Sequence, residues 1–199
     1  MAWRAKYKQI MHTEEHKIPD DVADGIAKNV FLPSSTPENA YIWSRCLTDI
    51  REKSISTSTV RICAGGRRSG YKGKMPGLLE EIILSLDKSK PIFLLGGFGG
   101  IVGEVCSLIL NNDVPDSLTE DWQIGHNDGY SELQKIAHAH GRGSNYEAIT
   151  RTIQQLEVSK LSARSGLEEL DYRTLMSSTF VDECVYLILK GLNTINLEL

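Results

Sequence analysis

A basic, glycine-rich loop is the part of the sequence whose residue types are best suited to chemistry. Its glycine pair is Gly65-Gly66, and its cations are Arg67, Arg68, Lys72 and Lys74. Glycine lets backbone amides approach a phosphate closely, and arginine can hold two phosphate oxygens at once. The loop therefore predicts a phosphate-binding site. The alternative is an exposed loop that is basic without binding an anion.

A second glycine-rich corner follows a short apolar run and comprises Gly96, Gly97, Phe98, Gly99, Gly100 and Gly103. We expect the amides of Gly97 to Gly100 to line the same pocket. Tyr71 or Phe98 is a candidate for stacking on a base, with packing as the alternative for Phe98. The corner approaches the GxGxxG pattern of dinucleotide-binding folds, but its last glycine comes one position too late and no suitable acidic ribose-binding residue follows. A classical NAD-dependent oxidoreductase is therefore disfavoured, and no cofactor is expected.

Two strand-to-helix units are predicted to position these loops. Residues 59–64 form a β-prone run before the basic loop, and residues 78–86 form an amphipathic helical pattern after it. Residues 91–95 are typical of a buried strand, which leads through the glycine corner into another helix. Open α/β sheets bind ligands beyond the carboxyl ends of their strands. The predicted fold class is therefore α/β, with a Rossmann-like parallel sheet, flanking helices and a mostly helical C-terminal third.

The whole chain, residues 1–199, is predicted to form one domain. Residues 1–35 are irregular, with one possible short helical face. Thr36 and Pro37 are a typical capping residue and first-turn proline, so a helix is expected from there to about Lys53. Residues 111–129 are expected to be mostly loop. The other expected helices span residues 131–140, 145–156, 167–176 and 179–192.

Composition and charge exclude several classes of protein. The chain has 199 residues, 41% of them hydrophobic and 24% charged, and a net charge of −4. Because acidic residues dominate the helices while the basic loop is local, a nucleic-acid binder is disfavoured and a focused anion site is favoured. No signal peptide or membrane-spanning run is visible, so a cytoplasmic protein without a membrane role is expected.

Cysteine and histidine usage indicates neither disulfides nor a metal site. The cysteines, Cys46, Cys63, Cys106 and Cys184, are scattered in apolar contexts without a CxxC spacing. This pattern is typical of reduced core cysteines. His12 and His16 are four residues apart, but no third ligand is well placed, so we expect no bound metal.

The stretch from about Thr36 to Gly103 resembles the SLOG superfamily. This Rossmann-like group includes the DNA-processing protein DprA/Smf and the Lonely Guy cytokinin-activating enzymes. The Lonely Guy motif PGGxGTxxE is matched by Gly65, Gly66, Gly77 and Glu81, and Arg51 stands near the position of the family's catalytic arginine. Ala64 and Leu78 replace the motif's proline and threonine, and ten residues separate Gly66 from Gly77 where the enzymes have one. The likeness is greatest to SLOG domains associated with TIR or sirtuin-like NADase effectors of bacterial anti-phage defence.

The resemblance implies a domain that senses a nucleotide. The expected ligand is an ADP-ribose-type or cyclic nucleotide second messenger, bound without turnover because the insertion displaces the phosphate cradle. The expected partners are this small molecule, an effector domain in cis or in trans, and further copies of the chain in a homo-oligomer. One alternative is a nucleoside 5'-monophosphate phosphoribohydrolase that uses Arg51 and Glu81, and another is a protein-interaction module. SLOG domains usually open with a strand and a glycine turn, which residues 1–35 do not supply, so the chain is expected to be either a fragment or a domain that has lost that edge.

Overall fold

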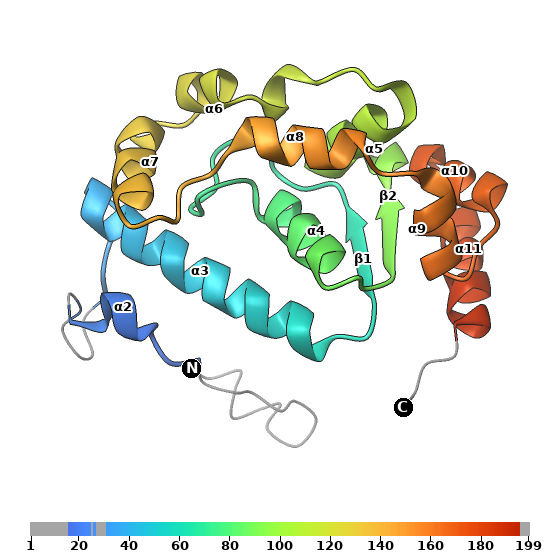
Figure 1. The fold of residues 1–199 in the computed structure, drawn as a ribbon, viewed down its shortest axis with the longest axis horizontal. Helices are drawn as coiled ribbons and strands as arrows, with labels where there is room; N and C mark the ends of the chain where they lie inside the picture. Colours follow the sequence, from blue (N-terminus) through green and yellow to red (C-terminus); the bar gives the residue numbers. More distant parts are fainter. Residues whose placement is uncertain (1–15, 25, 27–30, 196–199) are drawn as a thin grey trace.

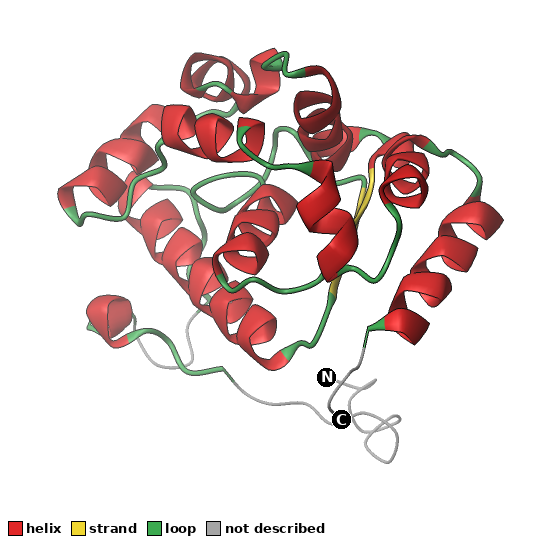
Figure 2. Ribbon diagram, turned by 45° about the vertical axis from the view of Figure 1, so that its right-hand side comes forward, coloured by secondary structure: helices red, strands yellow, loops and turns green. Residues whose placement is uncertain are grey.

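The computed structural model places a small parallel sheet among helices (Figures 1 and 2). It describes residues 16–24, 26 and 31–195. Within these residues the sheet has two strands, β1 (Arg61–Ala64) and β2 (Ile92–Leu95), which run parallel with Cys63 opposite Leu94. The predicted parallel pairing is confirmed, but the Rossmann-like sheet is reduced to its minimum and the chain is mostly helical. The possible N-terminal helical face and His12 lie outside the described residues.

At the outer edge of β2, side chains take the place of a further strand within the described residues. The hydroxyls of Tyr172 and Ser165 both donate to the Ile92 carbonyl oxygen, at 2.6 and 2.8 Å. These groups come from α10 (Glu169–Ser177) and from the residue after α9 (Val158–Arg164). All residues of β2 are buried, whereas Ile62 on β1 is 46% exposed. The C-terminal helices therefore take the place that additional strands occupy in a larger sheet.

The longest described helix, α3 (Pro37–Thr57), begins where its sequence signals predict. The Thr36 side chain accepts a hydrogen bond from the Asn39 amide, and Pro37 occupies the first turn, where its missing N–H costs nothing. The helix continues beyond the predicted end near Lys53. It packs against α4 (Gly77–Asp87) and α7 (Tyr130–Ala139), so it lies beside the end of the basic loop that leads into α4.

The second strand leads through a short 3-10 turn, η1 (Gly96–Phe98), into α5 (Gly100–Asn111). The remaining elements are α2 (Asp20–Ala23), η2 (Asp116–Leu118), α6 (Glu120–His126), α8 (Tyr146–Gln154) and α11 (Val181–Thr194). Helices α7, α8, α10 and α11 match predicted helices to within a few residues. The sequence analysis missed α6, which it placed in a loop, and α9. The α6 helix has the cap signal that could have revealed it, because the Thr119 side chain accepts from the Trp122 amide.

The hydrophobic core lies around β2 and the inner faces of α4, α5 and α10. Phe93, Leu79, Ile101 and Tyr172 are all fully buried in it. Cys63, Cys106 and Cys184 are buried and Cys46 is partly buried, all as free thiols, as the sequence predicts for core cysteines. No helix in the described part of the chain is long and apolar enough to cross a membrane.

Candidate functional site

The two glycine corners lie against each other at the carboxyl ends of β1 and β2. The amides of Ile101 and Val102, in the first turn of α5, donate to the carbonyl oxygens of Gly66 and Gly65 at 3.1 and 3.0 Å. A Cβ atom on Gly100 would overlap the backbone of both Gly65 and Gly66. The parallel strands thus bring the predicted loops together, and glycine is what permits their backbones to touch.

This contact changes which backbone groups are available to a ligand. Amides at a helix N-terminus can hold an anion, but here those of Ile101 and Val102 are satisfied by carbonyl groups. Gly97 is packed with its backbone against the Ser178 carbonyl. In contrast, Gly65 and Gly99 have left-handed φ angles of 66° and 68° and open space where a side chain would start. Gly65 and Gly99 therefore have open space beside the backbone, but the Gly99 amide is itself satisfied, because it donates to the Gly96 carbonyl oxygen at 2.9 Å.

The cations of the basic loop do not converge on one point. Arg67 donates to the Gly70 carbonyl oxygen at 3.1 Å, and Arg68 pairs with Glu104 of α5 at 2.9 Å. Lys72 is exposed, whereas Lys74 points inward, with its Nζ 3.5 Å from Glu80 Oε1. Phe98 is 40% exposed, next to the open Gly99. The predicted ligand-binding residues therefore form two groups, an outer one at the glycine corners and an inner one between α3 and α4.

The basic loop is anchored along its length by groups that the sequence analysis did not identify. The Lys74 carbonyl oxygen accepts from the Tyr130 hydroxyl, the Gln134 amide and the Ser144 hydroxyl, at 2.5, 2.6 and 2.8 Å. Gln123 of α6 accepts a hydrogen bond from the Tyr71 hydroxyl at 2.6 Å and donates to the Arg68 carbonyl oxygen. These supports come from helices distant in sequence, so no local pattern marks them.

Tyr71 is consequently committed to packing. Its ring meets that of Tyr130 edge-on, with centroids 6.0 Å apart. Burial raises the pKa of the Tyr71 hydroxyl above its ordinary value. Phe98 is the better placed of the two candidates for stacking on a base, because its ring is the more accessible.

In the inner group, Arg51 of α3 is held between two glutamates of α4. Its Nη1 donates to Glu80 Oε2 at 2.6 Å, and its Nε lies 3.8 Å from Glu81 Oε1. Glu80 also accepts from the Thr48 hydroxyl at 2.6 Å and is 2% exposed. Glu81, the residue that matches the family motif, pairs with Arg61 of β1. Arg51 and Glu81 thus lie side by side, and the main partner of Arg51 is Glu80, which no sequence motif marked.

Gly77, the later glycine of the motif, lies directly under Arg51. A Cβ atom at this position would stand 2.7 Å from Arg51 Nη2, and one at Gly73 would stand 3.1 Å from Nη1. The two glycines therefore make room for the guanidinium at the start of α4. Gly77 therefore has a role in packing. Its role in ligand binding stays a prediction.

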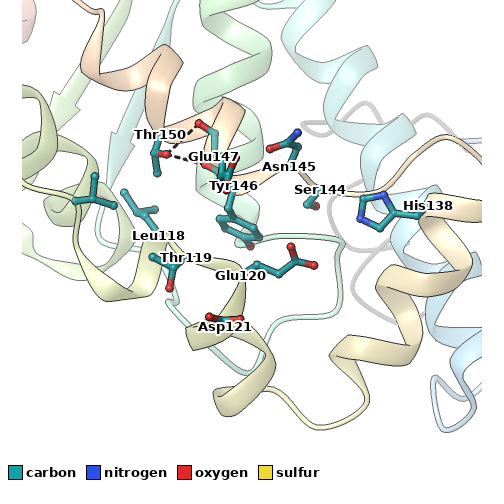
Figure 3. Close-up of a pocket in the computed structure, with 11 residues that line it drawn as sticks. Leu118, Thr119, Glu120, Asp121, His138, Ser144, Asn145, Tyr146, Glu147 and Thr150 are labelled. Atoms are coloured by element: carbon teal, nitrogen blue, oxygen red, sulfur yellow. Dashed lines mark hydrogen bonds between the residues drawn. The ribbon is translucent and has the colours of Figure 1, made fainter.

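A pocket of about 600 Å³ lies apart from the glycine corners, between α6, α8 and the segment before α8 (Figure 3). Glu120, Asp121 and Glu147 line it together with His138 and Tyr146. Carboxylates repel a phosphate, so this pocket is electrostatically unsuited to the anion that the basic loop predicts. Within the described residues, no group of at least three His, Cys, Asp or Glu side chains could hold a metal ion.

Comparison with protein families gives a match. A family described as SLOG cluster2 matches residues 1–175. The chain belongs to the SLOG cluster2 family. The SLOG cluster2 match includes both glycine corners, the basic loop and Arg51, and it ends within α10. Searches of curated proteins and of solved structures found no match. The resemblance to SLOG proteins noted in the sequence is thereby confirmed at the level of the family.

Proposed function

We propose that this SLOG cluster2 protein senses a nucleotide at the outer group of residues. The observation that carries the proposal is the contact between the two glycine corners. It leaves Gly65 and Gly99 open beside the exposed Arg67 and Arg68. A phosphate at this edge would meet open space beside the glycines together with arginine side chains, which can hold phosphate oxygens.

The exposed ion pair between Arg68 and Glu104 is compatible with this proposal. The Arg68 side chain is 55% exposed, and an exposed pair of this kind contributes only about 0–1 kcal/mol. Arg68 can therefore exchange Glu104 for a ligand phosphate at little cost. The base of the nucleotide would stack on the ring of Phe98, which is exposed.

The ligand class that we propose is an ADP-ribose-type or cyclic nucleotide second messenger. Its two features, phosphate and base, match the arginines and Phe98. The proposed role is regulation of an anti-phage effector of TIR or sirtuin-like NADase type, attached in cis or acting in trans. Self-association of the chain is part of this proposal, and light scattering of the purified protein checks it.

Binding without turnover is favoured by the state of the inner group. Arg51 is 16% exposed, and its charge is engaged by Glu80 and Glu81. An arginine that is buried and neutralised in this way supports the fold and is not free to stabilise a reacting sugar. The second candidate function, hydrolysis of a nucleoside 5'-monophosphate, has one observation in its favour, namely that Arg51 and Glu81 do lie side by side.

Calorimetry with ADP-ribose and with cyclic dinucleotides tests the proposal. We expect binding by the parent chain and a loss of affinity of about tenfold or more in a variant with Arg67→Ala and Arg68→Ala, since each charge-assisted contact is worth about 1.5–3 kcal/mol. A variant with Arg151→Ala and Arg164→Ala, which removes two other cations from α8 and α9, should bind like the parent. If no nucleotide binds at millimolar concentration, the sensing proposal is wrong, and the alternative that the chain is a protein-interaction module is favoured.

Incubation with AMP-type nucleotides separates sensing from hydrolysis. The proposal expects no release of free base above the rate in buffer. Release at a turnover-like rate that Glu81→Ala abolishes would instead establish the phosphoribohydrolase.

A further inference from the structure

Helices α3 and α7 pack against each other (Figure 1). A small, cation-lined pocket lies between α3 and the end of α7. Its volume is about 40 Å³, which is room for roughly three water molecules. Arg45, Lys74 and Arg142 line it from three different parts of the chain, together with the buried Ser44 and Tyr41. Glu52 is the single carboxylate in this lining. The pocket is therefore predominantly cationic and of a size for a small anion.

Arg45 carries an unused donor at this place. Its side chain is only 10% exposed. Its Nε donates to Asp21 Oδ2 at 2.9 Å, and its Nη2 lies 3.7 Å from Asp49 Oδ1. Its Nη1 is buried and has no hydrogen-bond partner among the described residues. Buried polar groups nearly always have a partner, and a charged donor without one is costly. The position is typical of a group that is completed by a ligand.

The other lining groups are also able to receive an anion. Lys74 Nζ forms an ion pair with Glu80 Oε1 at 3.5 Å. Ser44, which is 3% exposed, adds a hydroxyl to the lining. The Arg142 side chain, which is 44% exposed, also lines the pocket. Two guanidinium groups, an ammonium and a hydroxyl thus surround one small space.

We propose that this pocket binds an oxyanion of phosphate type, either inorganic phosphate or the terminal phosphate of a phosphomonoester. Arginine forks match the geometry of phosphate oxygens, and lysine adds charge without a directional demand. The inference does not depend on the glycine corners, because none of the lining residues belongs to them. It adds to the chain a second anion site, between α3 and α7.

Asp21 of α2 opposes this binding. Its Oδ2 is shared by Arg45 Nε and, at 3.3 Å, by Arg142 Nε. One carboxylate therefore offsets both guanidinium charges of the proposed site. Removal of the Asp21 charge should strengthen phosphate binding, whereas removal of Arg142 should weaken it. The two substitutions should therefore change the phosphate affinity in opposite directions, which makes the site testable.

The experiment measures the thermal stability of the full chain as inorganic phosphate is titrated, with potassium chloride at equal ionic strength as the reference. Ligands that bind the folded state raise its stability with concentration, which yields an affinity. We expect phosphate to stabilise the parent chain more than chloride does. Asp21→Asn should tighten the affinity, and Arg142→Ala should weaken it, each about five- to tenfold for one charge at a partly solvated distance. Arg151→Ala, on the exposed face of α8, should leave the affinity unchanged.

Each outcome decides for or against the site. Equal responses to phosphate and chloride, or unchanged affinity in both Asp21→Asn and Arg142→Ala, would overturn it. The variant with Arg67→Ala and Arg68→Ala must retain phosphate binding here, so failure of the glycine-corner proposal and failure of this one are distinguishable. A titration with AMP beside phosphate identifies the source: tighter binding of AMP that is sensitive to Arg142→Ala indicates a phosphomonoester, and equal or weaker binding indicates the free ion.

Discussion

Arg51 of α3 donates from Nη1 to Glu80 Oε2 of α4 at 2.6 Å, and Glu80 is almost completely shielded from solvent. The Thr48 hydroxyl completes the environment of the same carboxylate. Because Arg51 also lies over Gly73 and Gly77, this ion pair fixes the end of the basic loop to the start of α4. This buried interaction therefore connects the two helices and the loop.

Removal of Arg51 should destabilise the protein strongly. Arg51→Ala leaves the Glu80 carboxylate buried without its main counter-charge, and breaking a buried pair from one side costs about 3–5 kcal/mol. Urea unfolding followed by circular dichroism measures this free energy. Lys160→Ala, which breaks an exposed pair with Glu157, is the control and should cost less than about 1 kcal/mol. A loss below 1 kcal/mol for Arg51→Ala would contradict the structural role.

The glycines of the second corner should differ in their tolerance of alanine. Gly97→Ala places a Cβ atom into the Ser178 carbonyl, so a shift of backbone is unavoidable and the loss should exceed about 2 kcal/mol. Gly99→Ala meets open space and carries only the strain of a backbone conformation that favours glycine, with φ 68° and ψ −148°, about 1–3 kcal/mol. Denaturant unfolding of both variants makes the comparison. If Gly99→Ala proves the more damaging, the packing assigned to Gly97 is wrong.

The anchor on the Lys74 carbonyl should control the mobility of the basic loop. Gln134→Ala removes one donor from this carbonyl and also the acceptor of the Ser144 amide, at 2.9 Å. Loss of such buried hydrogen bonds costs about 1–3 kcal/mol locally. Amide hydrogen exchange of residues 67–76 should therefore accelerate, while that of β2 changes little. Lys135→Ala, on the exposed side of α7, supplies the matched control, and equal exchange in the two variants would rule out the anchor.

Stability should fall in alkaline solution because several buried acids keep their protons in the folded state. Burial raises the pKa of Cys63 to about 11 and that of Cys106 to about 12, from an ordinary value of 9.0. Burial also raises the pKa of Tyr146 and Tyr172 above their ordinary value. Between pH 9 and 11 the unfolded chain therefore binds fewer protons than the folded chain, so the free energy of unfolding decreases with pH.

Urea unfolding at a series of pH values checks this linkage. Below about pH 8 these groups should have little effect on the free energy of unfolding, because they are protonated in both states. At higher pH the free energy of unfolding should decline as the thiols and phenols of the unfolded chain ionise. Cys63→Ala should make the decline less steep, whereas Cys46→Ala, at a partly exposed position, should alter it less. A free energy of unfolding that rises from pH 9 to 11 would show that the burial of these groups has been misassigned.

Local patterns in the sequence were sufficient to predict much of this fold. Thr36 and Pro37 marked the start of α3, and the apolar runs around Cys63 and Leu94 marked the two parallel strands. These features depend on neighbours in sequence, through caps, periodicity and glycine turns, and so they can be recognised without the tertiary structure. The same signals placed both glycine corners beyond the carboxyl ends of the strands.

The partners of the functional side chains could be decided only by the tertiary structure. Glu80 and Glu81 are adjacent in sequence, and only the packing of α3 on α4 determines that Arg51 bonds the first while Arg61 takes the second. Tyr172 closes the sheet edge from 80 residues away, which is why the predicted sheet ended after two strands. The sequence by itself determined where a phosphate-binding loop could form. Which of its cations remain free, and which additional residues join them, depends on helices that meet only when the chain folds.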